Sequence, residues 1–338
     1  MRRWTTPLIV VGIAVVGVLA AADALRGNRE PKAAAESPTI TRAAPPTLRD
    51  ILRRDAVTGF VLYSDDQCRL HSFLLPTLVD DIVRKDDGEA LVQCGFEVGG
   101  GRILKEGERP SPDRQLVAGC RGNRVEVWIE ESGRRLYSYR GCPPAWRPDG
   151  SLTYPQGDHI MNGEVVLFSA RELRAAARSH PNLKGFSGKI FVHATDLAWL
   201  DEDRLIVSLE AVGQYVEPQY LTAMFFGKAL VGSASRFGQP AGGWFVSAAG
   251  NYAAAEDGTT VTRDGDFTDP PDNLPTGRAV AFSPDEQWLA YTTGVSIYLI
   301  GTPRNTEPGR IIRLPIAAKD LVWEPAGAPT TGTTTAVR

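Results

Sequence analysis

A cluster of oxygen-bearing side chains near position 268 has the residue types that calcium prefers. Carboxylate and amide oxygens at short spacing are the usual ligands of this ion in proteins. Their order does not fit an EF-hand loop, and Pro270-Pro271 interrupts it. Two interpretations stay open, a calcium site and a solvated hairpin loop, and the loop is preferred. The side chains concerned are Asp264, Asp266, Asp269, Asp272 and Asn273.

Nucleophilic and metal-assisted hydrolysis have recognisable spacings, and the sequence contains neither. No G-x-S-x-G elbow occurs, and the nearest segment, Gly185-Phe186-Ser187-Gly188, lacks the spacing. The histidines show no H-E-x-x-H pattern. We therefore assign no catalytic, cofactor-binding or metal-ligating residue, expect no cofactor, and favour binding over catalysis.

The chain has an even number of dispersed cysteines. They form no C-x-x-C pair, and their spacings are too wide for a zinc knuckle. Such cysteines behind an export-type segment indicate two disulfides outside the cytoplasm. Buried free thiols in a cytosolic protein are the alternative. We predict that Cys68 pairs with Cys94, and Cys120 with Cys142.

The N-terminus carries an apolar stretch from Pro7 to Ala22. Extended to Leu25, it approaches the ~17–25 residues of a membrane-spanning helix and exceeds the ~7–15 residues of a signal-peptide core. A cleaved signal peptide, processed near Ala22-Asp23-Ala24, is the alternative. We expect a signal anchor that keeps the protein at the cell membrane as a single-pass protein. The expected divisions are an anchor helix (1–25), a disordered linker (26–46), a folded domain (47–325) and a flexible tail (326–338).

A weak unit of strand, tight turn and strand recurs through the folded region. An aromatic residue ends the first strand, Pro presets φ for the turn, and Asp bonds its own backbone two residues further on. Six intervals between Ser64 and Glu324 give about 43 residues each, close to the ~40–45 residues of a four-stranded propeller blade. The clearest copies begin at Ala145-Trp146-Arg147-Pro148-Asp149-Gly150 and at Ala281-Phe282-Ser283-Pro284-Asp285-Glu286.

The two ends of the repeat region complete each other. The segments 59–64 and 68–73 resemble the second and third strands of a unit with no first strand before them. The segment 319–325 is a first strand with nothing after it. The C-terminal strand should therefore join the first blade and remove exposed sheet edges. The fold predicted is all-β, a six-bladed β-propeller closed by a C-terminal strand and preceded by one transmembrane helix. An open two-sheet sandwich is the alternative.

These segments resemble TolB-type, WD-like propeller repeats, in which a W-S-P-D-G-like segment opens each blade. The resemblance spans about 58 to 325, with close matches only at Trp146 to Gly150 and Phe282 to Glu286. It implies six blades and often an extracytoplasmic place, but no particular reaction. Some six-bladed propellers hydrolyse lactones or esters with a calcium ion in the tunnel. A calcium-dependent propeller hydrolase is therefore the alternative function.

Two departures from the repeat indicate where a partner binds. Ser169 and Glu172 form a capping box ahead of a helix that should interrupt the third blade. The fourth blade carries what looks like a long connection with Tyr215 and Tyr220. Packing of both tyrosines on the propeller rim is the alternative. A formal charge of −3 gives no electrostatic reason for nucleic acid. We expect a scaffold that binds a protein, an envelope polymer or a small ligand, with Glu172, Tyr215 and Tyr220 as partner surface.

Overall fold

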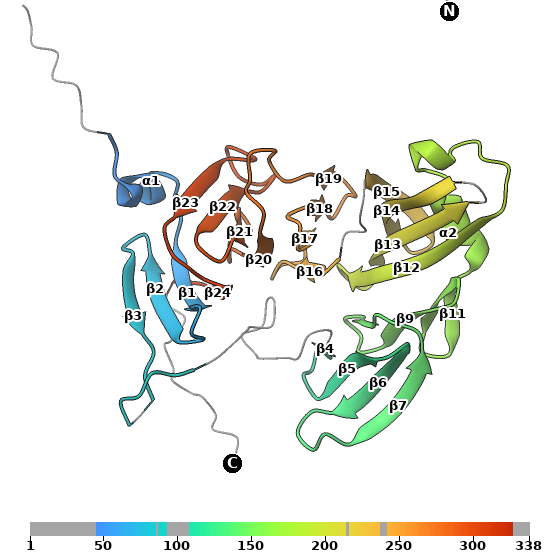
Figure 1. Ribbon diagram of the computed structural model, residues 1–338, viewed down its shortest axis with the longest axis horizontal. Coiled ribbons are helices and arrows are strands. Elements are labelled where there is room, and N and C mark those ends of the chain that lie inside the picture. The colour runs from blue at the N-terminus through green and yellow to red at the C-terminus, as the bar shows by residue number, and fades with distance from the viewer. Residues whose placement is uncertain (1–44, 86, 93–107, 214–215, 237–241, 327–338) are drawn as a thin grey trace, which may run out of the picture. The chain divides into compact units, whose positions relative to one another are not determined.

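The computed structural model describes residues 45–85, 87–92, 108–213, 216–236 and 242–326, within a compact unit that begins at Pro46. Its strands form six four-stranded antiparallel sheets, which we number 1 to 6 by the position of their second strand in the chain (Figure 1). Sheet 1 contains β24 (Asp320–Glu324), β1 (Gly59–Ser64), β2 (Leu70–Leu75) and β3 (Val79–Ile82). Sheet 2 contains β4 (Glu108–Pro110), β5 (Leu116–Arg121), β6 (Arg124–Ile129) and β7 (Arg135–Arg140).

The remaining sheets follow the chain in the same way. Sheet 3 contains β8 (Ala145–Trp146), β9 (Leu152–Gln156), β10 (His159–Asn162) and β11 (Val165–Phe168). Sheet 4 contains β12 (Ile190–Trp199), β13 (Arg204–Gly213), β14 (Val216–Phe226) and β15 (Ala229–Arg236). Sheet 5 contains β16 (Phe245–Val246), β17 (Tyr252–Ala254), β18 (Thr260–Thr262) and β19 (Phe267–Thr268). Sheet 6 contains β20 (Arg278–Phe282), β21 (Trp288–Thr292), β22 (Ile297–Gly301) and β23 (Ile311–Leu314).

The C-terminal strand joins the first sheet, as the sequence predicts. β24 pairs antiparallel with β1, with Val61 opposite Trp323 and Tyr63 opposite Leu321. Before β1 lies α1 (Leu48–Arg54), which Thr47 and Asp50 cap reciprocally. Its Leu52 is buried in a core shared by sheets 1 and 6. The predicted strand pairing is confirmed.

The repeat turns have the chemistry expected of them. The carboxylate of Asp149 accepts the backbone N–H of Ser151 at 2.8 Å, and that of Asp285 accepts the N–H of Gln287 at 3.1 Å. Asp201 does the same for Asp203 at 2.9 Å. Each of these aspartates closes a turn between the first and second strands of its sheet, as the repeat motif predicts.

The cores between sheets describe an order of neighbours but not a complete ring. Shared clusters of buried residues join sheet 1 to 6, 6 to 5, 5 to 4, 4 to 3 and 3 to 2. Within the described residues no such cluster joins sheet 2 to sheet 1. The closed ring that we predicted is therefore not what the structure shows. The connection between these two sheets includes 93–107, which lie outside the described part.

Two predictions about sheets 3 and 4 need correction. The helix α2 (Ala170–Ala177), capped by Ser169 and Glu172, follows β11 instead of interrupting sheet 3, because that sheet already has its four strands. The 3-10 turn η1 (Pro181–Leu183) then leads to β12. The described part of the supposed long connection of sheet 4 is strand, since β14 begins at Val216 and pairs with β13 over most of its length.

The disulfide prediction is confirmed for one pair. Cys120 and Cys142 are joined, with 5.9 Å between their Cα atoms. Cys68 is also disulfide-bonded, and its predicted partner Cys94 lies outside the described residues. None of the helices in the described part is long and apolar enough to cross a membrane. The predicted anchor segment (1–25) belongs to the residues that the structure does not describe.

Candidate ligand-binding site

The first strands of sheets 2 to 5 surround a pocket of about 380 Å³. Short strands β4, β8 and β16 each contribute one or two residues, and the long strand β12 contributes its last two. Pockets built from several rigid elements and a few polar groups are the usual ligand sites of proteins. The side chains that matter below are Arg109, Trp146, Trp199, Trp244 and Glu256.

Three tryptophans are held in place by hydrogen bonds to the sheet before their own. Trp146 Nε1 donates to the carbonyl oxygen of Arg109 at 2.8 Å. Trp199 Nε1 donates to Oγ1 of Thr153, and Trp244 Nε1 to Oγ of Ser208, each at 2.9 Å. A buried indole N–H needs such a partner, and here the partner always belongs to the preceding sheet. The bonds therefore fix the pocket wall and align successive sheets.

The three rings differ in how much of them a ligand could reach. Trp244 and Trp199 are only 5% and 9% exposed. The guanidinium of Arg147 lies 5.0 Å from the centroid of the Trp199 ring and covers it. Trp146 is half-buried, so its ring is the most accessible aromatic surface of the pocket.

An ion pair crosses the site from sheet 2 to sheet 4. Arg109 Nη2 lies 2.8 Å from Oδ1 of Asp196, and Nη1 donates to the carbonyl oxygen of Leu197 at 2.7 Å. Asp196 is 4% exposed and also accepts the backbone N–H of Leu197 at 2.8 Å and that of Trp244 at 3.3 Å. A carboxylate buried this deeply is stabilised only with such partners. The charge of Arg109 is thus already compensated.

Glu256 is the remaining charged side chain of the pocket. It follows β17 and is exposed, and within the described residues its carboxylate makes no ion pair. Because Arg109 and Asp196 neutralise each other, the pocket wall carries one uncompensated negative charge and one accessible indole. Aromatic faces and carboxylates both attract cations, and indole also takes apolar groups. The arrangement suits a ligand that combines an apolar stem with a basic end.

The residues that the sequence singled out lie elsewhere, along sheet 4. Glu172 caps α2 and pairs with Lys228 at 3.1 Å, next to the turn between β14 and β15. Tyr220 is half-buried in β14, six positions before the end of that strand. Beside it, Gln219 accepts a hydrogen bond from Asn182 of η1 at 2.8 Å. The segment from α2 to η1 therefore runs along β14 between these two points, and Tyr215 lies outside the described residues.

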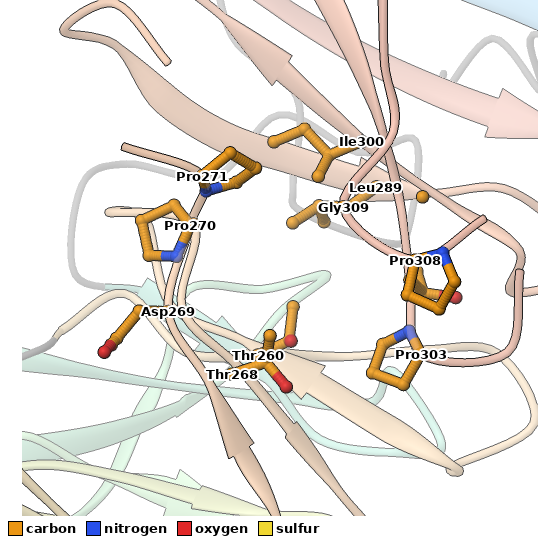
Figure 2. A pocket seen from close by; sticks show the side chains of 13 residues that line it. Thr260, Thr268, Asp269, Pro270, Pro271, Leu289, Ile300, Pro303, Pro308 and Gly309 are labelled. Carbon is orange, nitrogen blue, oxygen red and sulfur yellow. The ribbon is translucent and has the colours of Figure 1, made fainter. Parts of the chain in front are cut away.

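The acidic cluster is divided between a turn and a cavity wall. Asp264 and Asp266 lie in the turn between β18 and β19. Asp269 lines a cavity of about 180 Å³ in which Pro270 and Pro271 face Pro303 and Pro308 (Figure 2). In the described part of the chain no group of three or more His, Cys, Asp or Glu side chains is placed to hold a metal ion. The geometry gives the calcium interpretation no support.

Sequence reasoning missed the pocket although one of its tryptophans, Trp146, lies in a clear copy of the repeat. Trp146 and Trp199 end the first strands of their sheets, as the repeat predicts. Their convergence depends on how the sheets are arranged, which a repeat pattern does not specify. The partners Arg109 and Asp196 are 87 positions apart, and neither belongs to the repeat motif. No local signal could have paired them.

Comparison with known proteins adds three solved structures of low similarity. The β-propeller domain of Cps50 (Swd1) from Myceliophteria thermophila is 13% identical, with a TM-score of 0.40, covering 75% of this chain and 85% of that one. The WD40 domain of SCAP from fission yeast is 15% identical (TM-score 0.32, coverage 63% and 56%). The complex of the fission yeast SREBP and SCAP binding domains contains a chain that is 16% identical (TM-score 0.33, coverage 66% and 62%).

The sequence comparisons found less. No protein-family model matches the chain, and no curated protein matches it. TM-scores below 0.5 carry no argument. The fold is therefore assigned from the strands and sheets of this chain. Six four-stranded antiparallel sheets, three of which share the aspartate turn described above, define an all-β, WD-like β-propeller architecture.

Proposed function

We propose that the protein is a binding module that captures a partner through a basic group inserted into the tryptophan pocket. The observation that carries this proposal is that the uncompensated carboxylate of Glu256 and the accessible ring of Trp146 line the same pocket. The pocket is preorganised, because its tryptophans are fixed by hydrogen bonds between sheets. Preorganised sites bind more tightly because less freedom is lost on binding.

We place this module outside the cytoplasm, tethered by the apolar segment 1–25 through the linker 26–46. Support comes from the Cys120–Cys142 disulfide, because such bonds persist mainly in oxidising compartments. The sequence of 7–22 supports the tether, since it is apolar throughout. The TolB-like character of the propeller rests on the repeat turns alone.

A second contact with the same partner is proposed along sheet 4. Glu172, Tyr220 and the neighbouring Tyr215 would form it, in line with the frequent use of tyrosine at protein interfaces. Asn182 and Gln219 tie the helical segment to β14 and keep this surface in place. Replacing both tyrosines by alanine should lower the yield of crosslinked partner from the native envelope.

The test of the pocket uses two probes that differ only in charge. The full-length chain is titrated with N-acetyl-lysine amide and with N-acetyl-norleucine amide, and indole signals are followed by NMR. We expect the lysine probe alone to shift the Trp146 indole signal. Glu256→Gln should weaken this binding several-fold, whereas Glu131→Gln, at an exposed turn of sheet 2, should leave it unchanged. Equal shifts from both probes, or an unchanged affinity in Glu256→Gln, would refute the proposal.

A further inference from the structure

A second, larger cleft lies beside the middle of β12, on the N-terminal side of the residues that line the tryptophan pocket. It has a volume of about 670 Å³ and is lined by residues of sheets 2, 3 and 4. On β12, His193 lines this cleft and Trp199 lines the pocket, six positions further on, which corresponds to roughly 20 Å of strand. The other polar side chains at the cleft are Asn123, Arg140 and Gln156.

The floor of this cleft is rigid. Gly141 has φ of +121° and packs so closely on the β9–β10 hairpin that an added Cβ would lie 1.5 Å from the carbonyl oxygen of Pro155. Its N–H donates to the carbonyl oxygen of Asn123 at 2.8 Å. The disulfide from Cys142 to Cys120 ties the same segment to β5. Only glycine fits at position 141, and the three constraints together hold Arg140 at one edge of the cleft.

The electrostatics of the cleft are one-sided. Its lining contains no carboxylate, and within the described residues the guanidinium of Arg140 has no ion pair or hydrogen bond. Opposite Arg140 in the register, Arg124 is already engaged, since its Nε donates to Oγ of Ser138 at 2.9 Å. An exposed arginine left unpaired in a polar cleft can bind an oxyanion with two parallel hydrogen bonds.

Two acidic side chains lie near the cleft, but neither of them lines it. One is paired with other residues, and the other lies on the neighbouring strand. Asp158, next to the β9–β10 turn, lies 2.8 Å from the ring of His159 and 3.5 Å from Arg174. Glu210 lies opposite His193 in the register of β12 and β13 but is not part of the cleft wall. Among the lining residues, only His193 has a carboxylate as its cross-strand neighbour. The positive charge of the cleft is that of the Arg140 guanidinium.

We propose that this cleft binds an acidic sugar, with the carboxylate on Arg140 and the hydroxyl groups on the amides of Asn123 and Gln156. One arginine matches one carboxylate, whereas a nucleic acid would require a row of basic residues. The volume exceeds what a lone oxyanion needs, and exposed amides donate to and accept from hydroxyls equally well. The ligand class is thus a uronic acid, free or within a polymer. This site is separate from the tryptophan pocket and does not depend on the function proposed for it.

The experiment compares glucuronic acid with glucose, which lacks the carboxylate. Calorimetric titration of the full-length chain should show that glucuronic acid binds and that glucose binds at least about ten-fold more weakly, as expected for loss of a charge-assisted hydrogen bond. Arg140→Gln should lower the affinity for glucuronic acid by about the same factor. It removes no hydrogen bond or ion pair within the described residues, and circular dichroism verifies that the variant is folded.

The matched control is Arg124→Gln, which changes an exposed arginine on the adjacent strand and outside the cleft lining. It should bind glucuronic acid like the unchanged chain. Asn123→Ala and Gln156→Ala should each lower the affinity for both sugars by a few-fold. Three results would overturn the proposal. They are equal affinity for the two sugars, no effect of Arg140→Gln, and absence of glucuronic acid binding.

Discussion

The repeat turns of sheets 5 and 6 perform the same task with different residues. In sheet 6, Asp285 accepts a hydrogen bond from Ser283 Oγ at 2.6 Å and one from the N–H of Gln287, so the turn stabilises itself. In sheet 5 the corresponding position is Ala249, which has no side chain to accept anything. Its N–H instead donates to Oε1 of Glu286, which belongs to the turn of sheet 6, at 3.1 Å.

Glu286 is thus a shared group that completes a turn in the neighbouring sheet. Its second oxygen accepts from Nδ2 of Asn251 at 2.7 Å and faces Arg304 Nη1 at 3.2 Å. The side chain is 1% exposed, and the residue has φ of +60°, the left-handed region where the equivalent residue of sheet 5 is Gly250. A residue other than glycine in this conformation costs roughly 1–2 kcal/mol. The hydrogen bonds between sheets offset that cost, so one turn is local and the other depends on its neighbour.

The largest effect should come from removing the shared carboxylate. Glu286→Ala leaves the N–H of Ala249 and the amide of Asn251 without their acceptor, and both of these hydrogen bonds are part-buried. We expect the free energy of unfolding to fall by about 3 kcal/mol, measured by urea denaturation. Glu131→Ala, at an exposed turn of sheet 2, is the control and should change it by less than about 0.5 kcal/mol. A loss below about 1 kcal/mol in Glu286→Ala would contradict the coupling.

Glu286→Gly sharpens the same test, because glycine removes the carboxylate but also the unfavourable backbone conformation. It should be more stable than Glu286→Ala by about 1 kcal/mol. The reverse order would show that φ at this position is not strained. The two substitutions therefore separate the cost of the lost hydrogen bonds from the cost of the conformation.

The second-largest effect should come from acid, which should weaken the turn of sheet 5 that depends on Glu286. Burial disfavours the charged form of Glu286, but hydrogen bonds from Ser247, Asn251 and Ala249 outweigh it and hold its pKa below the ordinary glutamate value of 4.5. A carboxyl whose pKa is lower in the folded state contributes stability above its unfolded pKa and loses it as the pH falls through the folded pKa. The stability gap between the unchanged chain and Glu286→Gln should therefore be constant from pH 7 to about pH 5 and shrink below about pH 4.5.

Urea denaturation at a series of pH values measures this gap directly. Glu131→Gln, which lies in none of the networks described, should show a gap near zero at every pH. A gap for Glu286→Gln that stays constant down to pH 3 would show that the carboxylate does not contribute through its charge.

Local chemistry was predictable from the sequence because its partners are close in the chain. The turn aspartates bond two residues on, and the helix cap at Ser169 reaches three residues on. The pairing of β24 with β1 was also predictable, since each end of the repeat lacks the strand that the other supplies. The strand count of sheet 1 therefore followed from the pattern alone.

The site and the contacts between sheets were not predictable for the same physical reason. Glu286 reads as a turn residue, and only the neighbouring sheet reveals its acceptor role for Ala249, 37 positions away. The segment before Tyr220 reads as a loop because it contains Pro218 and polar residues, yet pairing with β13 makes it a strand. Tertiary pairing overrides local propensity at such places.

The smallest effect should come from the self-sufficient turn. Asp285→Ala removes the acceptor for Ser283 Oγ and for the N–H of Gln287, but Asp285 is exposed and water can replace it there. We expect a loss of about 1 kcal/mol in the free energy of unfolding, about a third of that for Glu286→Ala. Asp285→Asn keeps a side-chain oxygen at the same position and should recover most of the loss, because asparagine closes this kind of turn as aspartate does. If Asp285→Ala lowered the free energy of unfolding as much as Glu286→Ala, the turn of sheet 6 would not be self-sufficient. The distinction between a turn that stabilises itself and one that depends on the neighbouring sheet would then be wrong.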